Sequence, residues 1–219
     1  MADYVNKNIL SQAYVHIEMT ELSAENKKKF EHELLNFATS RGKFALYEDI
    51  APEVETKDGS LKVYSSITGT LSEALGDYPT FEEALNNLYV DAKRLAEGMI
   101  LETLFLARAR GQSITCREAR TGIIKSAKDL FDQIYALKTE GKDDSPAAAI
   151  KRISKVRLKL EALLHVLLSE DDKFLIKTQV SEKIKAIDVP HKVRDSNLPS
   201  DRVLYQTEKL RLITLAKVQ

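Results

Sequence analysis

Histidine and cysteine are the residues of this 219-residue chain best suited to bind a metal or attack a substrate. The histidines are His16, His32, His165 and His191, and no two of them share a helical turn. Cys116, the single cysteine, has no histidine near it in the sequence. Because metal ligands must converge from suitable spacings, this pattern favours structural histidines and no metal site. The alternative is a site assembled from distant residues, such as His16 or His165 with carboxylates.

Motifs for nucleotide binding or covalent catalysis are missing as well. The segment 122–126, Gly-Ile-Ile-Lys-Ser, lacks the Gly-Lys pair and the glycine-rich loop that lets backbone amides surround a phosphate. The acidic groups at 143–144 and 170–172 are predicted to lie in a loop and in a first helical turn, where carboxylates are favourable without a metal. We therefore expect no cofactor, no small-molecule ligand and no enzyme activity.

Basic residues are concentrated in two stretches of the second half of the chain. The candidate interaction or nucleic-acid surface consists of Arg108, Arg110, Arg117, Arg120, Lys151, Arg152 and Lys155. Such clusters bind nucleic acids by neutralising phosphates, so nucleic acid is one candidate partner. However, the chain has no tryptophan, few aromatic residues lie between these positions, and the net charge is zero. These features favour solvated helical faces.

Charge is unevenly distributed along the chain. Residues 1–107 carry 10 Lys/Arg against 18 Asp/Glu, whereas residues 108–219 carry 23 against 15. One interpretation is the ordinary composition of solvated helices. The other is that one half attracts an oppositely charged surface, such as the other half of a neighbouring copy.

The location of the protein is inferred from signals that the sequence lacks. A single cysteine excludes a disulfide within the chain. No apolar run approaches the ~18 residues of a membrane-spanning helix, and residues 1–7 show no basic region followed by an apolar run. We therefore expect a cytoplasmic protein that does not enter a membrane.

Residues 1–78 combine strand and helix signals. Alternation of apolar residues predicts a strand over 14–19, with Val15, Ile17 and Met19 on one face. Ser23 is a predicted N-cap of a helix that Gly42 ends. A short strand is predicted at 44–47, and Asp58-Gly59 predicts a tight turn between two further strands. This order predicts a small antiparallel sheet with a helix on one face, as a unit of residues 1–78.

Residues 79–219 read as a helical bundle, with few glycines and prolines to interrupt it. Capping boxes at 70–73 and 80–83 open a short turn and a long helix over 80–108. A helical hairpin is predicted over about 120–168, with Ser145-Pro146 starting its second helix. Further helices follow to the C-terminus, and residues 201–219 fit a helix or a strand, of which we favour the helix. The fold class is therefore α+β and predominantly helical.

Two stretches of the first half share residues with a known group of modules. They are Asp58-Gly59-Ser60-Leu61-Lys62-Val63, followed by Tyr78, Phe81, Ala84 and Asp91-Ala92-Lys93. Over about residues 12–107 the chain resembles small α+β modules of bacterial conflict and immunity systems, including bacterial relatives of the TRADD N-terminal adaptor domain. The resemblance implies a ferredoxin-like sheet and a noncatalytic adaptor that couples a sensor to an effector in antiviral defence. It supplies no catalytic residues and leaves the helical second half unexplained.

The predicted function is therefore that of a noncatalytic interaction or adaptor protein, acting through self-association or through docking of another protein. A homo-oligomer is the expected state. The alternative is a nucleic-acid-binding accessory protein that uses a basic helical surface.

Overall fold

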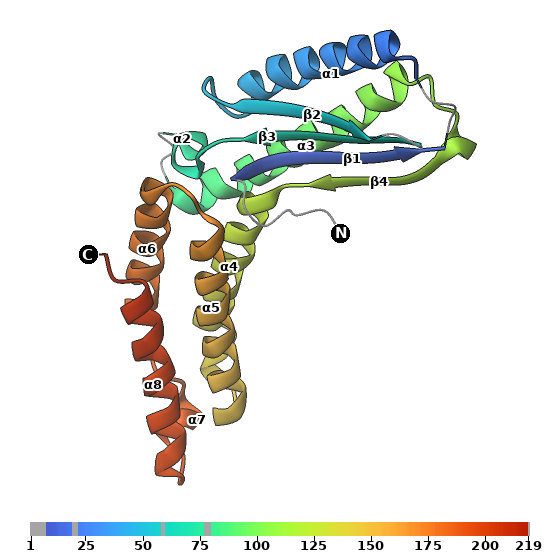
Figure 1. The fold of residues 1–219 in the computed structure, drawn as a ribbon. Helices are drawn as coiled ribbons and strands as arrows, with labels where there is room; N and C mark the ends of the chain where they lie inside the picture. Colours follow the sequence, from blue (N-terminus) through green and yellow to red (C-terminus); the bar gives the residue numbers. More distant parts are fainter. Residues whose placement is uncertain (1–7, 19–21, 58–59, 77–79, 219) are drawn as a thin grey trace. The chain divides into compact units, whose positions relative to one another are not determined.

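The computed structural model describes residues 8–18, 22–57, 60–76 and 80–218. These residues belong to two compact units, which divide between Lys125 and Ser126. Figure 1 shows one antiparallel sheet together with a larger number of helices. The predicted fold class, α+β and predominantly helical, is confirmed.

The described residues of the first unit form four strands, three α-helices and a short 3-10 turn at Gly111–Ser113. The strands and α-helices are β1 (Ile9–Ile17), α1 (Ala24–Ala45), β2 (Ala51–Lys57), β3 (Leu61–Thr68), α2 (Leu71–Leu75), α3 (Phe81–Leu106) and β4 (Ile114–Arg120). The sheet order is β2-β3-β1-β4, and each neighbouring pair is antiparallel. This is the β-α-β-β-α-β arrangement of ferredoxin-like folds.

Helices α1 and α3 cover one face of the sheet. Val15 and Ile17 of β1 are fully buried against them, as the alternation predicts, while Met19 lies outside the described residues. The strand begins earlier than predicted, because buried Ile9 and Leu10 extend its pairing with β3. Burial of apolar side chains from one sheet face and two helices provides the core of this unit.

Helix α1 continues one turn beyond the predicted end at Gly42. Ser23 caps the start of the helix as predicted, and its hydroxyl accepts a hydrogen bond from the backbone of Asn26. Gly42 is buried inside the helix, where a Cβ atom would overlap the side chains of Ile50 and Ile67. Its role is close packing rather than helix termination. The strand predicted at 44–47 is wrong, because its first half belongs to α1.

The capping signal of α3 is confirmed, whereas the capping box predicted at 70–73 is not formed. The Thr70 side chain makes no capping hydrogen bond and instead bonds the Glu73 side chain at 2.6 Å, while Gly76 ends α2 with a φ of 51°. Thr80 caps α3 through the backbone of Glu83. The predicted turn at Asp58-Gly59, together with Tyr78, lies outside the described residues.

Strand β4 is the main feature that the sequence analysis missed. Arg117 and Arg120 lie on this strand and not on a helical face, which corrects the prediction of a basic helical surface for them. Its sequence, ITCREAR, has no run of alternating apolar residues, because an edge strand needs little burial and is commonly charged. Since α3 and β4 complete the sheet unit, the units divide at 125/126 rather than at the expected 78/79.

The second unit is helical. Helix α4 (Gly122–Thr139) crosses the division, and a 3-10 turn at Gly141–Asp143 follows it. The remaining helices are α5 (Pro146–Val166), α6 (Glu170–Lys185), α7 (His191–Arg194) and α8 (Pro199–Leu215). The helix that we favoured for 201–219 is thus observed.

Helix α5 packs along α8. Its apolar stripe is buried, including Ile153, Val156 and Leu160. Ion pairs join α5 to α4 and to the connection between them: Lys159 pairs with Asp129 at 3.8 Å, and Arg152 pairs with Asp144 at 2.7 Å.

Candidate interaction face of the sheet

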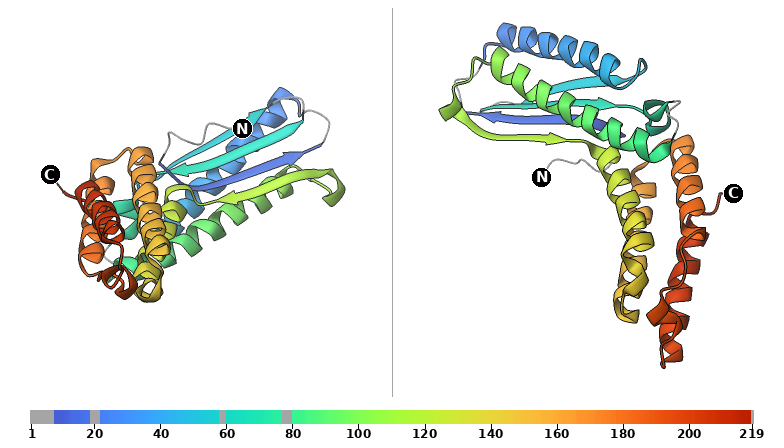
Figure 2. Two further views of the ribbon diagram at one scale, coloured as in Figure 1. Left: turned by 90° about the horizontal axis from the view of Figure 1, so that it is seen from below. Right: turned by 180° about the vertical axis from the view of Figure 1, so that it is seen from behind.

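The face of the sheet opposite α1 and α3 carries no helix within the described part of the first unit. Figure 2 shows the strands in front of these two helices when the molecule is seen from below. Side chains of a strand alternate between the two faces, so every second residue points away from the helices. We call this surface the open face.

The register of the four strands places twelve residues of the open face in three rows. The lysine row consists of Cys116, His16, Lys62 and Lys57, in the order β4, β1, β3, β2. The tyrosine row consists of Glu118, Tyr14, Tyr64 and Glu55 in the same order. The third row consists of Arg120, Gln12, Ser66 and Glu53.

Two tyrosines lie at the centre of the open face. Tyr14 of β1 and Tyr64 of β3 are register partners, with ring centroids 4.7 Å apart and planes tilted by 30°. Lys57 Nζ lies 5.1 Å from the centroid of the Tyr64 ring, within the range of a cation–π contact. Both rings are partly exposed. The pair is therefore an ordered aromatic platform that retains surface for a partner.

The lysine and tyrosine rows are accessible across all four strands, whereas the third row is accessible only at its ends, Arg120 and Glu53. Gln12 and Ser66, at the centre of the third row, are 5% and 8% exposed. In the lysine row, His16 Nε2 lies 2.8 Å from the hydroxyl of Ser60. This bond uses the imidazole of His16 within the chain, in agreement with a structural histidine.

Of the lysine and tyrosine rows, one is basic and the other is acidic, and their charges sum to zero when His16 is neutral. Lys57 and Lys62 lie in one row, and Glu55 and Glu118 lie in the other. Lys57 Nζ is 3.6 Å from Glu55 Oε1, and Glu118 pairs with Arg120 of the third row. A surface with this pattern attracts neither strong polyanions nor strong polycations.

Cys116 supplies the one thiol of the open face. Burial raises the pKa of its thiol above the ordinary value, and the neighbouring Glu118 carboxylate raises the pKa further. The thiolate is the reactive form, so this thiol ionises and reacts less readily than an exposed thiol at the same pH.

The basic residues of the first predicted cluster do not form one surface. Arg108 and Arg110 follow the end of α3, and Arg108 has a φ of 49°. Arg117 is the register partner of Val15, on the helix side of the sheet, whereas Arg120 lies on the open face opposite Gln12.

The second predicted cluster is more compact. Lys151, Arg152 and Lys155 line a cavity of about 310 Å³ together with Gln133 of α4. Arg152 is already paired with Glu140 and Asp144. Only the two lysines of this cluster form no ion pair with the rest of the described chain.

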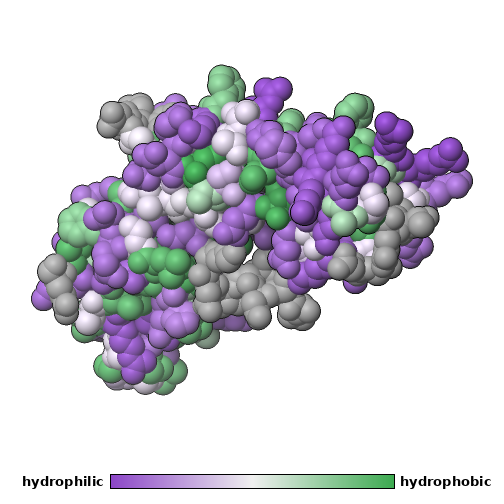
Figure 3. All heavy atoms as spheres, turned by 45° about the horizontal axis from the view of Figure 1, so that its top comes forward, coloured by the Kyte–Doolittle hydropathy of each residue, from purple (hydrophilic) through white to green (hydrophobic). Residues whose placement is uncertain are grey.

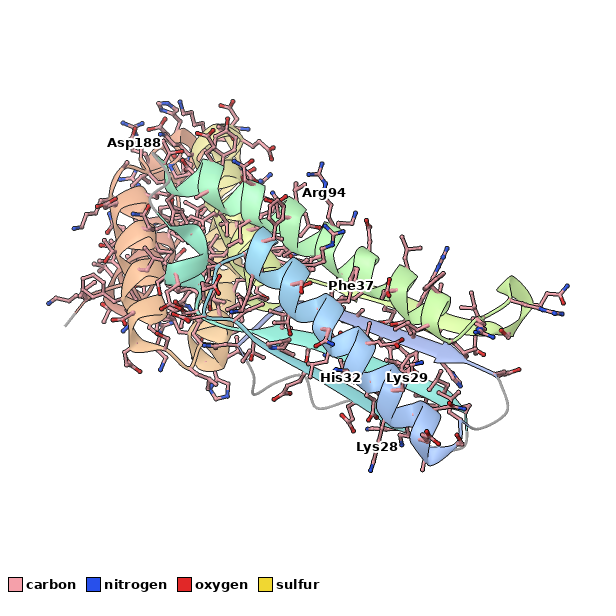
Figure 4. The ribbon with its side chains drawn as sticks, turned by 90° about the horizontal axis from the view of Figure 1, so that it is seen from above. Lys28, Lys29, His32, Phe37, Arg94 and Asp188 are labelled. Carbon is pink, nitrogen blue, oxygen red and sulfur yellow. The ribbon has the colours of Figure 1, made fainter. Side chains whose placement is uncertain are left out.

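The outer surface of α1 and α3 offers a second, more apolar region. A groove of about 430 Å³ is lined by Phe37 and Phe44 of α1 and by Arg94 and Leu95 of α3, among others. The Phe44 side chain is 88% exposed. Figure 4 shows Phe37 and Arg94 on this side, and Figure 3 shows its apolar side chains in small patches between hydrophilic ones. These small patches form no ordered array comparable with the rows of the open face.

Other site types find no support in the described part of the chain. It contains no group of three or more His, Cys, Asp or Glu residues arranged to hold a metal ion. No helix there combines the length and apolar composition needed to cross a membrane.

Sequence reasoning placed Tyr64 and Tyr14 on strands but missed their pairing. The sequence contains one tyrosine on the polar face of each of the two strands. That these tyrosines are neighbours follows only from the strand register, which depends on which strands pair. The chain gives no match to protein-family models, to curated proteins or to solved structures.

Proposed function

We propose that this chain is a noncatalytic interaction protein, an adaptor, that binds a protein partner through its open face. The observation that carries the proposal is the Tyr14–Tyr64 pair at the centre of a sheet face that bears no helix within the described part of the first unit. Tyrosine supplies a large and rigid contact area, and it is enriched among the residues that dominate protein–protein binding energy.

The charge pattern favours a protein over a nucleic acid as the partner. Glu55 and Glu118 flank the tyrosines in the same row, where they would repel a phosphate backbone. A protein surface can match alternating charges, which gives specificity to the pairing. The rim charges select the partner, while the tyrosines supply most of the contact.

The resemblance to bacterial conflict and immunity modules suggests the setting of this function. In this proposal the open face docks its protein partner in the cytoplasm, and the chain serves as an adaptor between a sensor and an effector of an antiviral defence system. The helical second unit then serves as the connection to the remaining component.

Cys116 allows a direct test, since it is the only cysteine and lies in the lysine row. A photoactivatable maleimide on Cys116 of the full chain is mixed with an extract of the cells that produce it, and then illuminated. We expect a discrete protein adduct that disappears when Tyr14 and Tyr64 are both replaced by serine. Moving the label to α1, with Cys116→Ser and Lys28→Cys, places it on the side shown in Figure 4 and should give no such adduct. Identical adducts from both label positions would contradict the proposal.

The alternative function is nucleic-acid binding through α5. It is favoured by the shared cavity beside Lys151 and Lys155. Its test is a gel shift with single-stranded and duplex nucleic acid at low salt, repeated with both lysines changed to alanine. A salt-dependent shift that the double variant loses would support this alternative, and the absence of any shift would eliminate it.

A further inference from the structure

The accessible rows of the open face are complementary to themselves. One row carries Lys57 and Lys62, and the adjacent row carries Glu55 and Tyr64 on the same two strands. We propose that the partner of the open face is the open face of a second copy of this chain, in a two-fold face-to-face dimer. This inference rests on the proposed function and identifies the partner for it.

The position of the two-fold axis follows from the charges. Face-to-face pairing requires an axis in the plane between the two sheets, because a closed dimer brings the same patch of both copies together. When the axis runs along the rows, midway between the lysine row and the tyrosine row, each row faces the other row of the second copy. Lys57 then faces Glu55, and Lys62 faces Tyr64.

The same axis also matches the remaining two strands. On β1, His16 faces Tyr14, and on β4, Cys116 faces Glu118. Stacked sheets lie about 10 Å apart, which lysine, glutamate and tyrosine side chains span from both sides. Each contact occurs twice, so two Lys57–Glu55 pairs and two Lys62–Tyr64 cation–π contacts form together.

Other two-fold axes bring like charges together. An axis along the tyrosine row places Glu55 of one copy against Glu55 of the other. An axis parallel to the strands, between β1 and β3, places Glu55 of one copy against Glu118 of the other. Like charges at an interface oppose binding, so the arrangement of the rows selects the first axis.

The exposed pair on β2 permits a charge-exchange experiment. Side-chain exposure is 52% for Lys57 and 66% for Glu55, so reversing either charge leaves the core untouched. The experiment uses sedimentation velocity and native mass spectrometry on the full chain over a range of micromolar concentrations. Wild type should dimerise with rising concentration. Either single variant, Glu55→Lys or Lys57→Glu, should raise the dimer dissociation constant about tenfold, because each creates two like-charge contacts.

A mixture of the two single variants gives the most direct test of the proposed pairing. In the mixed pair each new lysine faces a glutamate, so an equimolar mixture should form a heterodimer at concentrations at which each variant alone is mostly monomeric. The double variant, with both charges exchanged, should dimerise like wild type. A mixture that stays monomeric, or a wild type that stays monomeric throughout, would overturn the inference.

A matched control separates the interface from local charge effects. Lys29 and Glu33 form an exposed ion pair on α1, 3.9 Å apart, on the opposite side of the sheet. Reversing either charge there should leave dimerisation unchanged, and a tenfold loss from this control pair would refute the assignment. A monomeric wild type that still forms the Tyr14-dependent adduct from Cys116 would refute the dimer while retaining the proposed function. Loss of both results would refute both.

Discussion

Glu208 of α8 accepts hydrogen bonds from Arg157 and Ser154 of α5, at 2.9 Å from the Arg157 Nε and 3.1 Å from the Ser154 hydroxyl. Its side chain is only 12% exposed. The hydrogen bond from Arg157 is the main cause of a pKa below the usual value for the Glu208 carboxyl, and bonds from Arg211 and Ser154 lower the pKa further. These hydrogen bonds of Glu208 therefore join α5 to α8, which pack along each other in the second unit.

The first prediction concerns Glu208→Gln. Because the pKa is lower in the folded state, ionised Glu208 stabilises the fold above the ordinary carboxyl pKa of about 4.3, and this contribution disappears as the pH falls through the folded-state pKa. We expect the variant to lose about 1–2 kcal/mol of unfolding free energy at pH 7 and to show a weaker decline toward acid. Urea unfolding at several pH values measures both effects.

Glu161→Gln is the control for this prediction. Glu161 also pairs with Arg157, at 3.3 Å, but its side chain is 61% exposed. Exposed pairs contribute little, so the change in unfolding free energy should stay below about 0.5 kcal/mol. Equal effects of the two substitutions would show that burial of Glu208 is not the cause.

A second prediction is that Tyr205→Phe stabilises the protein. Tyr205 is fully buried on α8, and its hydroxyl has no hydrogen-bond partner within the described chain. Burial raises the pKa of this phenol. An unsatisfied buried hydroxyl costs free energy, so its removal should raise the unfolding free energy by about 1 kcal/mol. A rise in melting temperature by calorimetry would confirm this, and a fall would indicate a bonded water.

Tyr47→Phe makes the same chemical change and should have the opposite effect. The hydroxyl of Tyr47 accepts a hydrogen bond of 2.6 Å from the backbone amide of Thr70, next to the start of α2. Burial is the main cause of a raised pKa for this phenol. Removing the acceptor leaves a partly buried amide unpaired, so we expect a loss of about 1–2 kcal/mol. Opposite shifts in melting temperature for the two tyrosine variants provide the comparison.

Two helical glycines give a fourth prediction. Gly42→Ala should destabilise the protein by about 1–3 kcal/mol, because the new methyl group would overlap Ile50 and Ile67 in the core. Gly98→Ala should instead stabilise it by up to about 1 kcal/mol, since alanine favours helices and its nearest neighbour is Phe37 at 3.6 Å. Chemical denaturation of both variants tests the pair, and a stabilising Gly42→Ala would contradict the packing described for α1.

The helices were predictable because their signals are local. Ser23, Thr80 and Ser145 each occupy the capping position that the sequence indicates. An N-cap hydrogen bond joins residues three apart, so the information needed to recognise it lies within one turn.

The sheet was only partly predictable because its partners are distant in sequence. Strand β4 has a charged, edge-strand composition, and its pairing with β1 depends on contacts across almost the whole first unit. The open face has the same origin, since Tyr14 and Tyr64 become neighbours only through the register of β1 with β3. Gly42 was misread because a glycine that permits close packing and one that ends a helix look alike in a single sequence.

The late position of β4 in the chain has a consequence for biosynthesis. Strand β1 is central in the finished sheet, yet one of its two partners leaves the ribosome only after α3. Until then β1 is an edge strand of the nascent chain, and its unpaired backbone amides and carbonyls can pair with another extended segment. Fragments truncated before Ile114 should accordingly be prone to aggregate, whereas in fragments that include Arg120 the strand β4 can pair with β1.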